Sequence, residues 1–337
     1  MLTAKLGLGP MSIEIIEAIF RCSEAWQEQL MLISSKNQVD YNDGYVLDTD
    51  LYVSYIKELR KIYPGADVKL CRDHCGPGFK TDDQNTLEDT KKTIREDIKH
   101  GFDLIHLDLC HLEASHEEKL HDTAELINFC REQNPNIMIE IGTDENVGNT
   151  APDTKRIIQD IEFFLPICLP EFYVIQTGSL VRENYNSGSF YFNHVLSAFA
   201  KQKNIKIKEH NGDYLSFEQI VLRRGVIDAI NIAPQLGVAQ TQQTLLQALI
   251  YGINIQHFLD LVYKMGRWKK WINQENETNK YLCCLIAGHY HFNSHEYQII
   301  IEQLSKEIDI KEIIIETIIQ TIDHYICAFD GASDENN

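Results

Sequence analysis

Residues 104–110 read LIHLDLC, residues 136–141 read NIMIEI, and the polar stretch 116–132 lies between them. The two outer segments are short and rich in isoleucine and leucine, as buried strands are, whereas the middle segment has the apolar spacing of an amphipathic helix. A strand, a helix and a second strand in this order predict a βαβ unit with parallel strands.

The same alternation extends in both directions along the chain. Segments typical of strands lie at residues 5–9, 30–35, 67–72, 104–110, 136–141, 172–177, 205–210 and 229–233. Helical patterns lie between them at residues 12–29, 49–62, 86–100, 116–132, 154–164, 191–203 and 216–223. Eight strand–helix repeats predict an α/β fold of the (β/α)8, or TIM barrel, kind. A doubly wound open sheet is the alternative, although no Gly-rich dinucleotide loop follows the first strand.

The chain changes character beyond residue 240, where strand signals stop and long helical patterns follow. We therefore expect a barrel over residues 1–245, a helical C-terminal extension over 246–330 and a disordered tail over 331–337. The extension is expected to pack on the barrel or on a partner subunit. Its notable side chains are predicted to serve packing rather than a second metal site: Trp268, Trp271, His289, His291 and His295.

Composition excludes several classes of function. The formal net charge of −19 argues against binding to nucleic acid, because the phosphate backbone is recognised by basic surfaces. No apolar run approaches the roughly 20 residues that span a bilayer, and the first residues lack the pattern of a signal peptide, so we expect a cytoplasmic protein with no membrane partner. Nine scattered cysteines fit a reducing compartment better than a disulfide framework.

Polar residues recur at alternate positions of the predicted strands. Side chains on a strand point alternately to its two faces, so the isoleucines and leucines facing the helices leave the residues between them facing the barrel interior. The inward-facing polar residues are then His106, Asp108, Glu140, Gln176, Lys206, Lys208, His210 and Asn231. Buried polar groups are costly unless paired or bound to an ion, so their convergence predicts a site. A self-satisfied polar network without chemistry is the alternative.

Two histidines and a carboxylate follow strands directly and are expected on one rim of the barrel. They are His74 after the third strand, Glu140 at the fifth and His210 after the seventh. This combination suits Zn2+ or a similar divalent ion with an open coordination position. A thiolate site at Cys71 and Cys75 is a weaker alternative, because no second cysteine pair at zinc-site spacing accompanies it.

Several segments together carry a resemblance to a known family. They are SSKNQV (34–39), DHCGPG (73–78), HLDLC (106–110), IGTDE (141–145), QTG (176–178), EHNGDY (209–214), WKKW (268–271) and HYHF (289–292). In these segments the chain resembles the tagatose-bisphosphate aldolase non-catalytic subunit family, a branch related to class II aldolases that includes members similar to ketose-phosphate 4-epimerases. The resemblance covers nearly the whole chain and implies a barrel that binds a sugar phosphate.

The resemblance also implies roles for individual residues. His74 and His210 match two metal ligands of class II aldolases, and Glu140 matches an acidic residue close to the metal. Asp73 matches the residue that moves a proton at the reacting hydroxyl, and Glu145 lies where related aldolases carry a second catalytic acid. Asn231 matches a substrate-binding asparagine. The remaining expected substrate contacts are Asn37 and Asp108 at sugar hydroxyls, and Lys36, Lys208 and Arg182 as anion anchors.

Two departures from the aldolase pattern bear on function. Class II aldolases carry a third histidine ligand after the sixth strand, where this chain has Gln176, which offers only a weaker carbonyl oxygen. After His210 the chain has Asn211 and Asp213 in place of phosphate-binding Gly and Ser. A carboxylate repels phosphate, so Asp213 is expected to hold a sugar hydroxyl or a water.

The resemblance therefore implies a metal-dependent, class II aldolase-type enzyme that acts on a phosphorylated ketose or its triose fragments, by cleavage or by C4 epimerisation. The cofactor expected is a divalent ion, Zn2+ above others. The family name supports a second hypothesis, a non-catalytic accessory subunit that stabilises a partner aldolase. A decarboxylase or isomerase on a similar barrel is a third. The helical extension is a candidate surface for a homo-oligomer.

Overall fold

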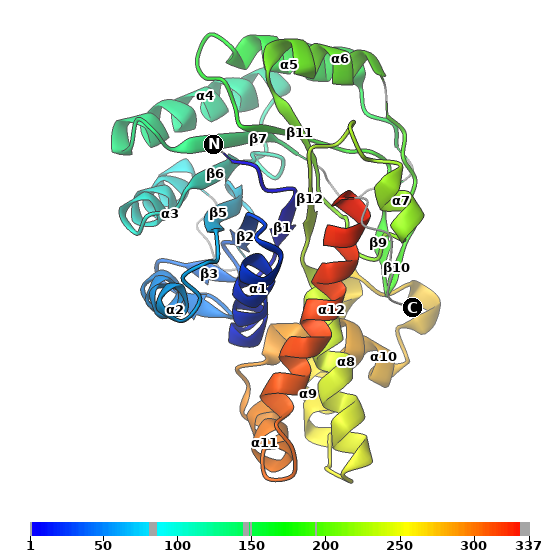
Figure 1. Ribbon diagram of the computed structural model, residues 1–337. Coiled ribbons are helices and arrows are strands. Elements are labelled where there is room, and N and C mark those ends of the chain that lie inside the picture. Colours follow the sequence, from blue (N-terminus) through cyan, green and yellow to red (C-terminus); the bar gives the residue numbers. More distant parts are fainter. Residues whose placement is uncertain (1, 81–85, 144–147, 149, 193, 331–337) are drawn as a thin grey trace.

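The computed structural model describes residues 2–80, 86–143, 148, 150–192 and 194–330. Its centre is a closed barrel of eight parallel strands in the order β1-β12-β11-β8-β7-β6-β5-β2 (Figure 1). The barrel strands are β1 (Leu6–Leu8), β2 (Leu30–Ser35), β5 (Val68–Cys75), β6 (Leu104–Leu107), β7 (Met138–Gly142), β8 (Phe172–Ile175), β11 (Lys206–Glu209) and β12 (Ala229–Ile232). Each overlaps one predicted strand, so the (β/α)8 prediction is confirmed.

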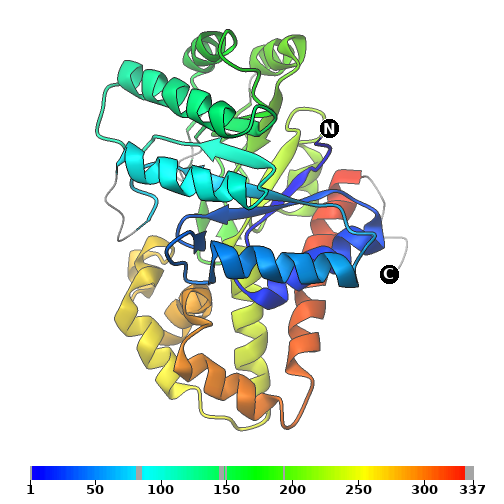
Figure 2. The same ribbon diagram turned by 90° about the vertical axis from the view of Figure 1, so that its left-hand side faces the viewer.

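Helices alternate with these strands and cover the outside of the barrel (Figures 1 and 2). They are α1 (Ile13–Trp26), α2 (Thr49–Ile62), α3 (Leu87–Lys99), α4 (His116–Gln133), α5 (Thr154–Phe164), α6 (His194–Lys203) and α7 (Phe217–Val221). Local signals fix where several of them begin. The Ser115 and Ser216 side chains each cap the third residue of a helix, and Glu118 and Gln219 bond back to the cap, which completes a capping box.

Two short ribbons lie outside the barrel. In one, β3 (Val39–Asp40) pairs with β4 (Leu47–Asp48), and in the other β9 (Val181–Arg182) pairs with β10 (Tyr185–Asn186). Both ribbons belong to loops that follow the carboxyl ends of barrel strands, where active sites of this fold form.

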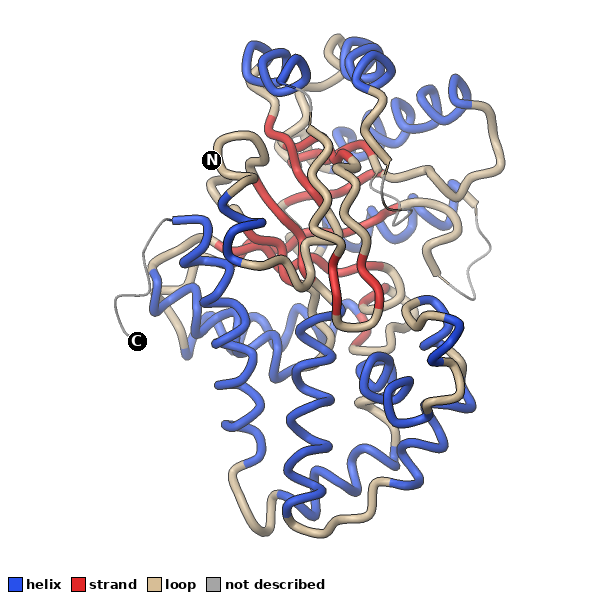
Figure 3. Tube along the Cα trace, turned by 90° about the vertical axis from the view of Figure 1, so that its right-hand side faces the viewer, coloured by secondary structure: helices blue, strands red, loops and turns tan. Residues whose placement is uncertain are grey.

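Helices continue after the last barrel strand and gather on one side of the barrel (Figure 3). They are α8 (Pro234–Ile250), α9 (Gln256–Met265), η1 (Arg267–Lys270), η2 (Gln274–Asn276), α10 (Lys280–Ala287), η3 (Gly288–His291), α11 (His295–Leu304) and α12 (Ile310–Asp330). The predicted C-terminal helices are thus present. A division into units at residues 245 and 246 stays a prediction. In the described parts of the chain, no helix is long and apolar enough to cross a membrane.

The final helix, α12, returns to the barrel and packs against α1, α7 and α8 (Figure 1). The Trp26 indole donates to Asp323 at 2.6 Å, and the Arg224 guanidinium donates to the Ala328 carbonyl at 2.6 Å. Because α12 lies between α7 and α1, it completes the ring of helices around the strands. The last helical segment therefore belongs to the layer that covers the barrel.

The barrel interior is apolar at one end and polar at the other. The amino-terminal floor is a separate buried cluster: Leu2, Ala4, Met31, Ile33, Cys71, Leu104, Phe172 and Ala229. Side chains two residues further along a strand point to the same interior, so Cys71 is followed by Asp73, Leu104 by His106 and Ala229 by Asn231. The strands thus supply a packed floor and a polar mouth.

Candidate metal centre

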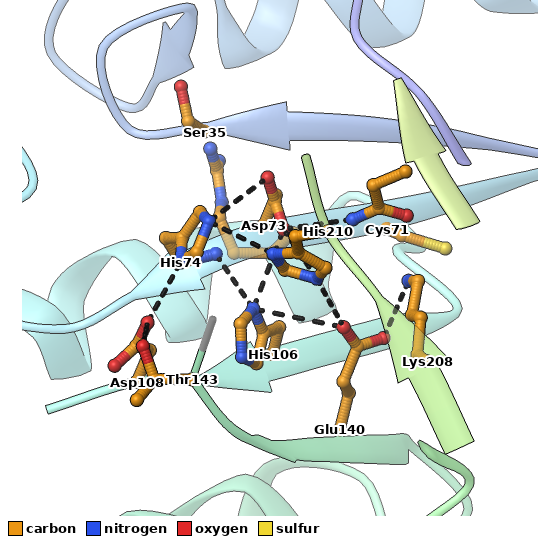
Figure 4. A network of polar contacts seen from close by, with 12 residues as sticks. Ser35, Cys71, Asp73, His74, His106, Asp108, Glu140, Thr143, Lys208 and His210 are labelled. Carbon is orange, nitrogen blue, oxygen red and sulfur yellow. Dashed lines mark hydrogen bonds and ion pairs between the residues drawn. The ribbon is translucent and has the colours of Figure 1, made fainter. Parts of the chain in front are cut away.

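Three imidazoles and a carboxylate meet at the mouth of the barrel (Figure 4). Asp73 and His74 come from the end of β5, His106 from β6, and His210 directly follows β11. One ligand atom from each lies within 4.8 Å of every other. Among the described residues, this is the group of histidine, cysteine and acidic side chains whose geometry can hold a metal ion.

The backbone at the end of β5 is shaped to aim His74 at this point. The β5–β6 register shifts between Arg72 and Cys75, and His74 has a φ of 46°, which a non-glycine residue seldom adopts. A Cβ on Gly76 would lie 1.7 Å from the Asp108 carbonyl oxygen, so only glycine lets the chain pass there. Such backbone strain, typically of order 1 kcal/mol or more per residue, concentrates at functional sites.

The hydrogen bonds of His74 and His210 determine which ring nitrogen of each is free. His74 Nδ1 lies 2.8 Å from Asp108 Oδ2, and a carboxylate can only accept, so Nδ1 carries the proton. His210 Nε2 lies 3.3 Å from Glu140 Oε1 and donates for the same reason. When both rings are neutral, the remaining nitrogens, His74 Nε2 and His210 Nδ1, present lone pairs, and they lie 3.2 Å apart.

Two lone pairs at this distance repel each other unless a shared proton or a metal ion lies between them. Two imidazoles that bind one tetrahedral Zn2+ with bonds of 2.0–2.1 Å have their nitrogens about 3.3 Å apart. The 3.2 Å separation of His74 Nε2 and His210 Nδ1 matches that spacing. Metal-binding histidines also characteristically donate their other N–H to a carboxylate or a carbonyl, as both residues do here.

His106 follows the same rule. Its Nε2 lies 2.8 Å from the Gly142 carbonyl oxygen and donates to it, which leaves Nδ1 as an acceptor 3.2 Å from the backbone N–H of His74. Burial lowers the pKa of His106, but Glu140, Asp73 and Asp108 outweigh it and raise the pKa to about 9. A proton on Nδ1 would conflict with the N–H of His74. A metal ion bound in the group would balance the negative charge of the carboxylates without placing a proton on His106 Nδ1.

Charges around the group favour a divalent cation. Burial raises the pKa of Asp73, but His74, His210 and His106 lower it far more, so the carboxylate is ionised. Asp108, beside His74, has a pKa well below its usual range despite burial. Burial also lowers the pKa of His210, to about 4, which keeps this imidazole neutral and able to bind a metal.

Glu140 and Lys208 form an ion pair beneath the imidazoles. Glu140 Oε2 accepts from Lys208 Nζ at 2.7 Å, and both side chains are almost completely buried. Burial opposes ionisation of Glu140, yet Lys208, His106 and His210 lower its pKa to about 2. With His106 neutral, as metal binding requires, the carboxylates Asp73, Asp108 and Glu140 carry three negative charges against the one positive charge of Lys208, so a divalent ion would balance the set.

Some predicted site residues support the group instead of lining it. Lys208, predicted as an anion anchor, is held by Glu140, and Lys36 is buried and paired with Asp89 at 3.1 Å. Asp108, predicted to bind a sugar hydroxyl, orients His74 and accepts from Thr143 Oγ1 at 3.0 Å. These positions are filled by pairs within the protein, which differs from the roles expected from the sequence.

Asp213 and Asn231 occupy the side of the mouth formed by β12 and α8. Asp213 Oδ1 accepts hydrogen bonds from the backbone N–H groups of Ala233 at 3.0 Å and Gln235 at 2.8 Å. These bonds fix the start of α8, which differs from the expected role of holding a sugar hydroxyl or a water. Burial raises the pKa of Asp213 to about 7, although these bonds lower it. Asn231 Nδ2 lies 3.5 Å from Asp73 Oδ1, and its buried Oδ1 has no partner among the described residues.

The mouth opens into a cavity of about 630 Å³. Asp73, His74, His210, Asn231 and Asp213 line it together with Asn37, whose Nδ2 donates to the Phe79 carbonyl at 2.5 Å. Arg182 of β9 lines the same cavity. Gln176 lines a neighbouring cavity with Asp108 and Thr143, and its buried Nε2 has no partner among the described residues. Glu145 lies outside the described residues.

His106 was predicted to face the barrel interior, but its membership of the metal group was not predicted. Also not predicted were Lys269, Lys270 and His289, which line the cavity from the extension. The WKKW and HYHF segments contain all three residues. The sequence singled out these segments, but it did not show that they fold back onto the cavity. The Cys71 and Cys75 thiols lie outside the group, and burial raises the pKa of both.

Solved structures with a similar fold include sugar-phosphate proteins. A probable tagatose 6 phosphate kinase from Sinorhizobium meliloti 1021 is similar with a TM-score of 0.80 and 14% identity, over 96% of this chain and 100% of that chain. The fructose-bisphosphate aldolase (Fba) of Campylobacter jejuni has a TM-score of 0.56 and 16% identity, over 96% and 90%. The YdjI aldolase of Escherichia coli K12 has 0.50 and 11%, over 90% of each chain.

At these identities the likeness shows the fold alone: a (β/α)8 barrel with C-terminal helices, of a kind that aldolases share. No protein-family model matches the sequence. No curated protein matches it either.

Proposed function

We propose that this protein is a metal-dependent, class II aldolase-type enzyme that acts on a phosphorylated ketose, by cleavage or by C4 epimerisation. The observation that carries the proposal is the pair of lone-pair nitrogens, His74 Nε2 and His210 Nδ1, which face each other at 3.2 Å. Each ring is fixed by a carboxylate on its far side. This arrangement supports the binding of a cation, and Zn2+ suits its imidazole donors best.

A divalent ion bound there would polarise the carbonyl of a ketose and lower the barrier to breaking the neighbouring carbon–carbon bond. The His74 and His210 rings would hold it, and His106 would lie beside them with its Nδ1 accepting the backbone N–H of His74. Asp108 and Glu140 keep the rings in the tautomers that bind metal. Gln176 and Glu140 were also predicted as ligands. Glu140 is already paired with Lys208, so we place it behind the His210 ring and not on the ion.

Asp73 is the proposed proton-transfer residue. Its ionised carboxylate lies 3.4 Å from His106 Nδ1 and lines the cavity, so it can accept the proton of a substrate hydroxyl. Loss of that proton turns the hydroxyl carbon into an aldehyde as the carbon–carbon bond breaks, and the electron pair remains on the carbon next to the carbonyl. Asn231, with an unpartnered amide oxygen at the same wall, can bind a hydroxyl of the sugar.

A second candidate is the accessory subunit of a separate aldolase. Gln176 favours it, because an amide lies where class II aldolases carry a third histidine and its Nε2 has no partner among the described residues. In that case the cavity would bind the sugar phosphate without net turnover.

The test is to incubate the zinc-loaded protein with a panel of ketose mono- and bisphosphates and to follow them by proton NMR. We expect cleavage to a triose phosphate and an aldehyde, or conversion to the C4 epimer, and we expect neither with His74→Ala. If none of the ketose phosphates in the panel is converted, the enzyme hypothesis is refuted. Stimulation of an added partner aldolase by the same sample would then support the accessory role.

A further inference from the structure

The cavity has a second cluster of functional groups, on the wall formed by the C-terminal extension. Arg182 from β9 and Lys269 and Lys270 from η1 all line it. Among the described residues, no salt bridge joins any of these three side chains to a carboxylate. The chain as a whole has a net charge of −19, so these three cations make the cavity wall a local region of positive charge.

The backbone holds this cationic wall in place. The Arg182 guanidinium donates to the Lys270 carbonyl at 2.5 Å, and the N–H of Glu183 donates to the Trp271 carbonyl at 2.8 Å. Glu183 Oε1 in turn accepts from the backbone N–H of Asn273 at 3.1 Å. These bonds fasten the β9–β10 ribbon to the extension, so the positions of the cations do not depend on flexible side chains alone.

The same ribbon is fastened to the metal side of the cavity. Asn186 Nδ2 donates to the carbonyls of Asn211 and Asp213, both at 2.7 Å, in the loop that directly follows His210. The ribbon therefore links the cationic wall to the loop that carries a predicted metal ligand. A ligand that contacts both walls would be held by one connected framework.

The buried histidine of the extension supplies an independent sign of a ligand. His289 is 1% exposed and lines the cavity, and neither of its ring nitrogens has a hydrogen-bond partner among the described residues. Leaving a buried donor or acceptor unpaired costs about 1–3 kcal/mol. Burial, His291 and Arg267 lower the pKa of His289 to about 3 and outweigh a backbone contact with Ile286 that raises it, so the ring is neutral and carries one N–H and one lone pair.

The positive charges also crowd one another. Lys270 keeps contact with solvent, yet partial burial and the charge of Arg182 lower its pKa. Two lysines and an arginine held together gain most from a compact anion with several oxygens, and phosphate matches that description.

We propose that Arg182, Lys269, Lys270 and His289 form a binding subsite for the phosphate group of the ligand, on the cavity wall built by β9 and the C-terminal extension. The proposal deepens the proposed function and rests on it for the identity of the rest of the ligand. Of the three anion anchors expected from the sequence, it keeps Arg182 and replaces Lys36 and Lys208, which are paired with carboxylates, by Lys269, Lys270 and His289 of the extension.

The test measures binding of inorganic phosphate to the zinc-loaded full chain by isothermal titration calorimetry. The variant is Lys269→Gln/Lys270→Gln, and the matched control is Lys264→Gln/Lys306→Gln, which removes two exposed lysines of the same extension away from the cavity. We expect the first variant to weaken phosphate binding by at least about tenfold, since charge-assisted contacts are lost. We expect the control to leave it unchanged. Equal dissociation constants for the two variants would overturn the subsite.

His289→Phe is a second test, in which we expect the stability of the protein to increase and its affinity for phosphate to decrease. The phenylalanine keeps the ring that packs on Tyr290 and removes two unpaired buried nitrogens, so we expect a higher melting temperature together with weaker phosphate binding. A higher melting temperature with unchanged phosphate binding would remove His289 from the subsite.

These outcomes separate the subsite from the proposed reaction. If phosphate binding depends on Lys269 and Lys270 but no ketose phosphate is converted, the subsite stands and the enzyme hypothesis fails. If ketose phosphates are converted equally well by the double variant, with unchanged KM, the reaction stands and the subsite fails.

Discussion

The contact between Asp108 and His74 offers the sharpest test of how the metal centre is built. Asp108 is 2% exposed and accepts three hydrogen bonds: from His74 Nδ1 at 2.8 Å, Thr143 Oγ1 at 3.0 Å and the backbone N–H of Cys110 at 2.9 Å. In Asp108→Asn the amide oxygen can still accept from the loop, but the negative charge that fixes the His74 tautomer is lost.

Loss of a carboxylate behind a metal-binding histidine typically weakens metal affinity about 10- to 100-fold. That range corresponds to about 1.4–2.7 kcal/mol of binding free energy. We therefore expect Asp108→Asn to raise the dissociation constant for Zn2+ by this factor. The unfolding free energy in the presence of a chelator should change less, because the amide oxygen can still accept the N–H of Cys110 and the Thr143 hydroxyl can accept from the amide NH2.

The assay is competition for Zn2+ with a chromophoric chelator, followed by absorbance. The matched control is Asp103→Asn at the other end of β6, where the carboxylate accepts the backbone N–H of Leu70 at 2.8 Å and faces no histidine of the group. A folded Asp108→Asn variant that binds Zn2+ within about twofold of the unmodified protein would refute the assigned role of Asp108.

Three further outcomes follow from the same geometry. Lys208→Met should lower the unfolding free energy measured with urea by about 3 kcal/mol, because it leaves Glu140 buried without its cation, and Lys208→Met/Glu140→Gln should recover much of that loss; no recovery would contradict the pairing. The pKa of Asp213, raised by burial to about 7, means that the folded protein keeps a proton that the unfolded chain releases near pH 4. Stability should therefore fall as pH rises from about 4 to 7, and urea titrations at several pH values should show a flatter profile for Asp213→Asn. Chelation should lower the melting temperature of the unmodified protein but not of His74→Ala, and equal shifts in calorimetry would place the stabilising ion elsewhere.

The strands and the direction of their side chains were predictable from the sequence. Alternation has a period of two, so the isoleucines around His106 and Glu140 were enough to place these residues in the interior. The closed order of the eight strands followed from repeated strand–helix pairs, because parallel strands need crossover helices.

The partners of those inward residues were not predictable, since they depend on register and on loops. Lys208 and Glu140 both point inward, but only the spatial order β7-β8-β11 brings them within 2.7 Å of each other. His106 reaches the metal group because the bulge in β5 turns His74 toward it. Lys269 and Lys270 are distant in sequence from the barrel strands, and their place at the cavity depends on how the extension folds back.

The central claim is that His74 Nε2 and His210 Nδ1 bind one divalent ion between them. A crystal grown with Zn2+ and measured on both sides of the zinc absorption edge tests it directly by anomalous scattering. We predict one strong peak at bonding distance, about 2.0–2.1 Å, from both nitrogens, with Asp108 and Glu140 still behind the rings. A map without a peak at this position, in crystals that contain Zn2+, would contradict the metal centre.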